Sequence, residues 1–151
     1  MKSLQIYNGD LSLDSGGRLE FVQGGNKLIQ DLRLWLQEPI GTSFTAPSFG
    51  SILTSLVGGT IGVTTTSQVQ SEVQRVLGLY QSQQLINLKS AQNASQLANW
   101  NKSEIISSIN SIKVEQNNTT IIVSVGLTTL ASSNISLTLF VNSNGVQVSN
   151  G

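Results

Sequence analysis

The stretch that decides the fold is TIIVSVGLTTLASSNISLTLFVNSNGVQVSN, residues 120–150. Apolar side chains alternate along it with polar or small ones, which is the period of half-buried β-strands. The alternating apolar positions are Ile121, Val123, Val125, Leu127, Ile135, Leu137, Leu139, Val141, Val146 and Val148. Asn144-Gly145 is a strong signal for a two-residue hairpin turn, and Asn117-Asn118 marks an earlier turn. The pattern predicts an antiparallel β-meander over residues 109–149 with one apolar face.

A helix with an apolar stripe can cover such a face, and the segment NKLIQDLRLWLQ, residues 26–37, has that stripe. The residues that share one helical face are Leu28, Ile29, Leu32, Trp35 and Leu36. We expect this helix to start at an Asn26 cap. It should end near Glu38, because Pro39 disfavours a helical conformation in the residue before it.

A second amphipathic helix is expected after a Gly- and Thr-rich linker loop at residues 58–66, with Thr66 or Ser67 as its cap. Its apolar face consists of Val69, Val73, Val76, Leu77 and Tyr80. The following Gln-, Leu- and Ala-rich residues favour continuation to about Asn99, and a break near Asn87 or Asn93 is the alternative.

Residues 1–24 contain short alternating pieces separated by Asn8-Gly9 and Gly16-Gly17, which predicts an N-terminal hairpin. The expected fold class is therefore α+β: an N-terminal hairpin, two amphipathic helices of which the second is long, and a C-terminal antiparallel β-meander. At 151 residues the chain has the size of a single domain, residues 1–151.

The composition excludes several classes of function. Charged residues are 11% of the chain, less than half of the roughly 25% that is usual, and the net charge is +0. This argues against a nucleic-acid partner and favours association with other proteins. No apolar run is long enough to cross a membrane, and MKSLQIYNGD lacks the apolar core of a secretion signal. We therefore expect no membrane contact and a cytoplasmic site of synthesis.

The residues that usually carry catalysis are few. The chain has no His and no Cys, and a Ser nucleophile has no elbow motif. Asp31 is placed to pair with Lys27 on the first helix, and Glu72 is expected on a polar helix face. None of the eight acidic residues is predicted to lie in an apolar pocket beside a second carboxylate. We expect no enzymatic activity, no cofactor and no metal site.

The order of motifs in the first third of the chain resembles the baseplate wedge proteins of contractile-tailed phages. These belong to a family shared with a type VI secretion baseplate component, and the family sometimes carries the label lysozyme-like. The residues that carry the resemblance are Gly9, Asp10 and Leu11; Leu19, Val22 and Gly24; Gln30, Asp31, Leu32 and Arg33; Gly41, Thr42 and Phe44; Pro47, Phe49, Gly50, Ile52 and Leu53.

The chain departs from the family at one motif. Many members carry a Glu-Pro-Arg triplet between the second helix and the first C-terminal strand, and this chain has none. Glu38-Pro39 ends the first helix and is not its counterpart. Glu104 is the nearest positional match, as a candidate remnant of that site.

The resemblance implies a structural virion protein of the tail baseplate, assembled in the host cytoplasm. It would contact other wedge proteins and the tail sheath protein, with the tail tube or central hub as a further candidate partner, and it would start sheath polymerisation by strand exchange. The expected contact edge comprises Ile135, Leu137, Leu139, Val141, Val146 and Val148. The alternatives are a tail-associated peptidoglycan-degrading enzyme and a carbohydrate- or receptor-binding tail module.

The segment LQEPIGTSFTAPSFGS, residues 36–51, holds both prolines of the chain and has neither helical nor strand period. We expect Phe44 and Phe49 to anchor this loop to the core, near Trp35, with Pro47 in the loop. Gly50 is expected where the loop passes close to another backbone segment.

Overall fold

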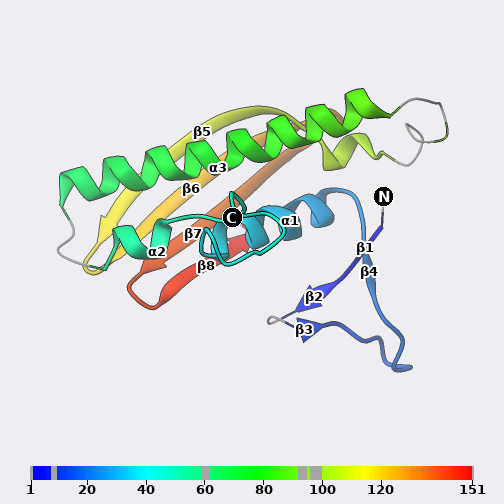
Figure 1. Cartoon of the computed structure of the whole chain (residues 1–151), viewed down its shortest axis with the longest axis horizontal. Helices are drawn as coiled ribbons and strands as arrows, with labels where there is room; N and C mark the ends of the chain where they lie inside the picture. The colour runs from blue at the N-terminus through cyan, green and yellow to red at the C-terminus, as the bar shows by residue number, and fades with distance from the viewer. Residues whose placement is uncertain (1, 8–9, 59–61, 92–94, 96–99, 151) are drawn as a thin grey trace.

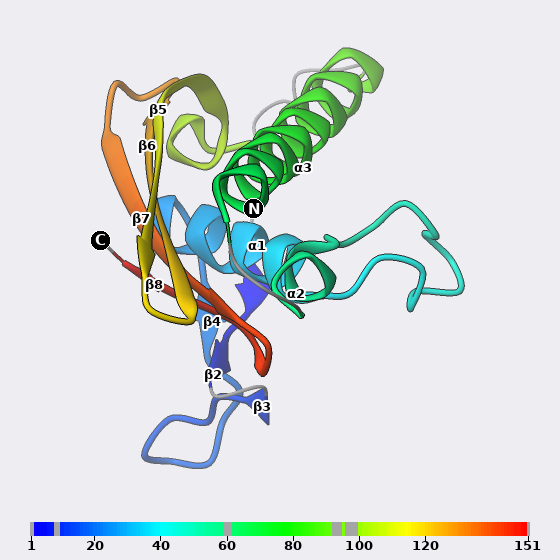
Figure 2. The same cartoon turned by 90° about the vertical axis from the view of Figure 1, so that its left-hand side faces the viewer.

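The computed structural model describes residues 2–7, 10–58, 62–91, 95 and 100–150. It has the predicted α+β class, with helices packed on one face of a four-stranded sheet. Figure 2 shows this arrangement edge-on, with the sheet on one side and the helices on the other. The predictions of a single antiparallel C-terminal sheet and of a long second helix are confirmed.

The sheet consists of β5 (Ile106–Asn117), β6 (Thr120–Thr129), β7 (Asn134–Asn142) and β8 (Gly145–Asn150), in that order and all antiparallel. Its register pairs Ile121 with Val141 and Val141 with Val146, so the alternating apolar positions of neighbouring strands face the same side. The helices cover this face, and the period of two is preserved across β6, β7 and β8.

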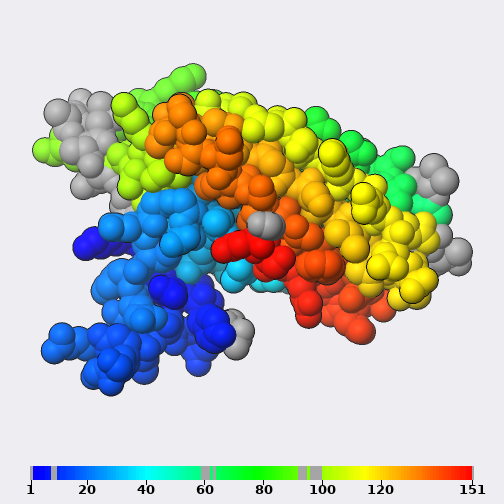
Figure 3. Space-filling model, turned by 180° about the vertical axis from the view of Figure 1, so that it is seen from behind, coloured from blue at the N-terminus to red at the C-terminus, as the bar shows by residue number. Residues whose placement is uncertain are grey.

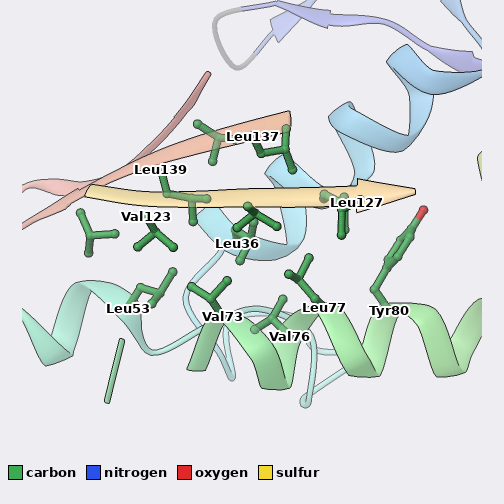
Figure 4. Close-up of a cluster of buried hydrophobic side chains, with 14 of the residues drawn as sticks. Leu36, Leu53, Val73, Val76, Leu77, Tyr80, Val123, Leu127, Leu137 and Leu139 are labelled. Atoms are coloured by element: carbon green, nitrogen blue, oxygen red, sulfur yellow. The ribbon is translucent and has the colours of Figure 1, made fainter. Parts of the chain in front are cut away.

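In the described part of the chain, three α-helices lie on that face. α1 (Gly25–Gln37) and the short α2 (Leu53–Leu56) contact β8, and α3 (Val63–Ser90) crosses β5 (Figure 1). Figure 4 shows the interior between the layers, where Leu36 and Leu53 meet Leu77 from α3 and Leu139 from the sheet. All four side chains are fully buried. Burial of apolar area on both layers is the main source of the stability of this arrangement.

The end of α1 agrees with the prediction from the sequence, and its start differs from it by one to two residues. The backbone leaves the helical conformation at Glu38, before Pro39, as predicted. The helix begins at Gly25 after Gly24, which adopts a positive φ of 67°, and so Asn26 is not the cap.

The second helix begins earlier than predicted. It includes Val63–Thr66, so the expected linker loop over residues 58–66 is shorter, and neither Thr66 nor Ser67 is the cap. Thr65 is buried, and its hydroxyl accepts a hydrogen bond from the Gly62 N–H at 3.3 Å. The helix of 28 residues, about 42 Å long, runs without a break through Asn87. The alternative break at Asn93 and the continuation to Asn99 lie outside the described residues.

The N-terminal segment forms an arm that projects from the body (Figure 1). It contains two short antiparallel pairs, β1 (Ser3–Leu4) with β4 (Phe21–Val22) and β2 (Ile6–Tyr7) with β3 (Asp10–Leu11). The predicted hairpin is therefore present as paired pieces, while its Asn8-Gly9 turn lies outside the described residues. The arm exposes several large apolar side chains, namely Tyr7, Leu11, Leu13, Leu19 and Phe21.

Candidate assembly interface

The order of strands corrects the predicted contact edge. β7 lies between β6 and β8, so Ile135, Leu137, Leu139 and Val141 are on an internal strand, and their side chains are buried in the core. Alternation along a strand shows which face is apolar, but it does not show which strand is outermost. Of the six residues predicted for the edge, only Val146 and Val148 belong to an outer strand, β8.

The backbone groups of β8 that are available to another strand can be assigned from the hairpin. Its two-residue loop, residues 143–144, closes on the pair Asn142 and Gly145. In such a hairpin the pair that flanks the loop is hydrogen-bonded, and pairs alternate along the ladder. Residues 145, 147 and 149 therefore bond to β7. Val146, Val148 and Asn150 turn their N–H and C=O groups outward, and no described strand lies on that side of β8.

A groove of about 510 Å³ lies between this outer edge and α1. Figure 3 shows the C-terminal strand, in red, beside the blue segment that includes α1. The groove is lined by Gln147, Val148 and Ser149 of β8, by Phe140, by Ile6, and by Gln30, Arg33, Leu34 and Gln37 of α1. The outer edge of β8 thus faces this groove. The opposite wall of the groove combines apolar side chains with one positively charged residue, Arg33.

The QDLR motif, residues 30–33, connects this groove to the rest of the molecule. The Gln30 side chain accepts a hydrogen bond from the Ile6 N–H and donates one to the Leu4 carbonyl, both at 2.9 Å, which fixes the N-terminal arm to α1. Leu32 is fully buried in the core. Arg33 lines the groove, so one turn of α1 holds the arm, the core and the groove wall together.

Asp31, the remaining residue of the motif, faces α3. It forms the predicted ion pair with Lys27 and accepts a hydrogen bond from the Tyr80 hydroxyl at 3.1 Å. Burial, followed by the nearby Asp31 carboxylate, raises the pKa of Tyr80 far above its usual range. Tyr80 therefore stays protonated and acts as a hydrogen-bond donor between the two helices.

The loop from Glu38 to Ser51 closes at its base. The Ser51 N–H donates to the Glu38 carbonyl at 2.8 Å, and the Ile40 N–H donates to the Ser51 carbonyl at 3.1 Å. Gly50 has a φ of 106° and lies against the Glu38–Ile40 backbone, which confirms the predicted close approach. Figure 2 shows the loop standing out from the body between α1 and α2.

The two phenylalanines of this loop behave differently. Phe49 is half-buried and packs edge-on against Trp35, with 4.8 Å between the ring centroids. Phe44 was expected to anchor the loop to the core, and this is wrong, because its side chain is 98% exposed. Pro47 is also exposed. Backbone hydrogen bonds and Phe49 hold the base of the loop. The tip, with Phe44 and Pro47, is exposed.

A pair on α3 holds the end of the loop, which the sequence did not indicate. Glu72 is buried, although it was expected on a polar face, and its carboxylate accepts a hydrogen bond from the Ile52 N–H at 3.0 Å. Arg75 donates to the same carboxylate at 2.6 and 2.8 Å and to the Gly50 carbonyl at 3.3 Å. Burial opposes ionisation of Glu72, but the bonds from Arg75 and Ile52 outweigh it and lower the pKa of Glu72.

Glu104, the candidate remnant of the family triplet, is buried at the junction of three elements. It ends the short helix η1 (Lys102–Glu104), and its carboxylate accepts a hydrogen bond from the Gly24 N–H at 2.8 Å, at the start of α1. Gln84 of α3 donates to the Glu104 carbonyl at 2.6 Å. A carboxylate beside a helix N-terminus is stabilised by the helix dipole, so Glu104 fixes the start of α1.

Glu104 also lines a cavity of about 210 Å³ with Asp31, Tyr80 and the two tryptophans, Trp35 and Trp100. A buried acid thus shares a cavity with a second carboxylate, which the sequence did not predict. The sequence could not show this shared cavity, because residues 31 and 104 line it together only when α1 packs against η1.

In the described ranges, no three His, Cys, Asp or Glu side chains form a group that could hold a metal ion. No described helix is both long and apolar enough to span a membrane. No family model, curated protein or solved structure matches the chain.

Proposed function

We propose that this chain is an inner wedge component of a contractile-tail baseplate, and that it starts polymerisation of the sheath by receiving a strand from a sheath subunit. The protein would be assembled in the host cytoplasm and would reside in the virion, in contact with other wedge proteins and with the tail tube or hub as a further candidate partner. The observation that carries this proposal is the outer edge of β8, where alternate backbone groups face a groove instead of another described strand.

Three further features support the proposal. An exposed sheet edge is the usual acceptor in strand addition, where main-chain hydrogen bonds supply the affinity. The β8 sequence, GVQVSN, contains no charged residue that would repel an incoming strand. Two motifs of the resemblance lie near this edge or lead to an element that contacts it: Arg33 lines the groove, and Gly50 shapes the loop that leads into α2, which contacts β8.

The experiment blocks the edge while keeping the sheet. Val146→Pro removes one outward N–H, and the Val146 N–H has no bond to β7 that this change would break. Val146→Ala is the matched control, because it shortens the same side chain and keeps the N–H. Deleting β8 would be less informative, since it would also remove Val148 from the core.

Each variant is co-expressed with a contractile-tail sheath protein, and sheath assembly is observed by electron microscopy. The wild-type chain and Val146→Ala should seed sheath, and Val146→Pro should not. Normal seeding by a folded Val146→Pro protein would overturn strand addition at β8. Failure of the wild-type chain to seed or bind any sheath protein would overturn the proposed function itself.

A peptidoglycan-degrading enzyme remains the second candidate, because Glu104 and Asp31 line one cavity. Both carboxylates already accept hydrogen bonds within the protein, Glu104 from Gly24 and Asp31 from Tyr80. These bonds give each acid a structural role, which favours the wedge proposal. Clearing of a peptidoglycan suspension by the purified protein, with loss of clearing in Glu104→Gln, would favour the enzyme instead.

A further inference from the structure

We propose that the strand received by β8 carries an acidic side chain that pairs with Arg33 on the opposite wall of the groove. The inference rests on the proposed function, since it specifies the chemistry of the strand that the β8 edge receives. It makes the partner an extended segment with one Asp or Glu among mainly apolar or neutral residues.

The first observation is the unsatisfied Nε atom of the Arg33 side chain. Its Nε atom is buried and has no hydrogen-bond acceptor within the described part of the chain. A guanidinium has five N–H donors and cannot lose its charge in a protein. A buried donor without an acceptor is unfavourable, and a carboxylate relieves that cost best because it accepts two parallel bonds from the guanidinium.

The second observation is the charge around Arg33. It lines both the groove beside β8 and a smaller cavity of about 190 Å³ under the N-terminal arm. Among the described residues that line these two spaces, Arg33 is the one that carries a charge. The other polar groups that line these spaces are neutral, such as Gln37 and Gln147, so no acidic side chain among them balances the positive charge. An incoming negative charge would complement it.

The third observation is position. Arg33 lines the groove from α1, and Val148, whose backbone groups point outward from β8, lines it from the other side. A strand paired with β8 would occupy the space between them, next to Arg33. Apolar side chains at Ile6, Leu34 and Phe140 line the rest of the groove, which suits apolar or neutral residues on either side of the acid.

The test is a double-mutant cycle with overlapping peptides that cover the neighbouring sheath subunit, titrated against the purified full chain. Peptides that bind the wild-type protein should contain an Asp or Glu. Changing that acid to Asn or Gln should weaken binding to the wild-type protein by about tenfold to a hundredfold. The Arg33→Gln protein should bind both peptides equally, at the weaker level.

Gln37→Ala is the control variant, because Gln37 lines the same wall and is neutral. It should keep the preference for the acidic peptide, and thermal unfolding of each variant reports whether it is folded. If Arg33→Gln keeps that preference, or if the peptides that bind contain no acid, the pairing with Arg33 is wrong. Strand addition would then still stand, provided that Val146→Pro loses peptide binding. If no peptide binds and the wild-type chain seeds no sheath, both proposals are overturned.

Discussion

A Cβ atom on Gly50 would lie 2.4 Å from the carbonyl oxygen of Glu38 and 3.0 Å from the Ile40 nitrogen. Two backbone segments therefore meet at a distance that only glycine permits, and the contact closes the loop between α1 and α2. This relationship explains the Phe-Gly pair at residues 49–50 in physical terms. The glycine is required for closure, and the adjacent Phe49 packs the closed loop against Trp35.

Gly50→Ala should destabilise the fold by roughly 2–5 kcal/mol, because it adds both a strained positive φ and a clash with backbone atoms that cannot move aside. Gly41→Ala is the control, since Gly41 has a φ of 84° but no atom within 4 Å of the place where a Cβ would lie. It should cost only the conformational part, about 1–2 kcal/mol. Chemical denaturation measures the free energy of unfolding of both variants, and equal losses of stability would contradict the close contact at Gly50.

Phe49→Ala and Phe44→Ala should differ although both residues lie in one loop. Phe49 is half-buried against Trp35, so its loss should cost about 2 kcal/mol, roughly half the value for a fully buried Phe. Phe44 is exposed, and its removal should change the free energy of unfolding by less than about 0.5 kcal/mol. Thermal unfolding of the two variants gives the comparison. A large loss of stability in Phe44→Ala would contradict the exposed position of its side chain.

Glu72 should make stability depend on acid pH. The pKa of Glu72 is lowered in the folded state, so its ionised form adds stability above the ordinary value of 4.5, and this is lost as pH falls through the folded-state pKa. Glu72→Gln should be less stable than the wild type by about 1–3 kcal/mol at pH 7, because Arg75 loses its charged acceptor. The difference in the free energy of unfolding between the two proteins should narrow as the pH falls below 4.5.

Chemical denaturation of the wild-type and Glu72→Gln proteins, at intervals of about one pH unit from pH 3 to pH 7, measures how the free energy of unfolding depends on pH. Glu115→Gln is the control, because Glu115 is an exposed acid on β5. A Glu72→Gln deficit that stays constant over this range would contradict the assigned linkage.

Glu104→Ala should loosen the start of α1, because the Gly24 N–H would lose its acceptor. The expected cost is about 1–3 kcal/mol. Hydrogen exchange should speed up first in the initial turn of α1, while β6 and β7 stay protected. Lys102→Ala, an exposed change on the same short helix η1, should leave exchange unaltered. Uniform acceleration over the whole chain would instead show that Glu104 acts on global stability.

The sequence predicted those parts of the fold that depend on local pattern. Alternation at Ile121–Leu127 and Ile135–Val141 predicted two paired strands with one buried face, and Pro39 predicted the end of α1. These signals are local because side-chain period and proline geometry do not depend on distant residues.

The parts that the sequence missed depend on distant partners. Glu72 and Glu104 are buried because the Ile52 and Gly24 N–H groups reach them across the fold, which no helical period reveals. The Phe44 prediction failed because an aperiodic loop gives no indication of which aromatic turns inward. The predicted edge was placed partly on β7, since alternation does not encode the lateral order of strands.

The two outer strands of the sheet are not equivalent. β5 has register shifts between Ile106 and Ser108 and between Ile109 and Ser111, and Gln81 and Gln84 of α3 bond to the backbone at its start. Lys113 and Glu115 add charges farther along, and such features discourage pairing with another strand. These features make β8 the more receptive of the two outer strands. Under the proposed function, a subunit with one receptive side would begin a polymer of other subunits without forming an endless filament of its own.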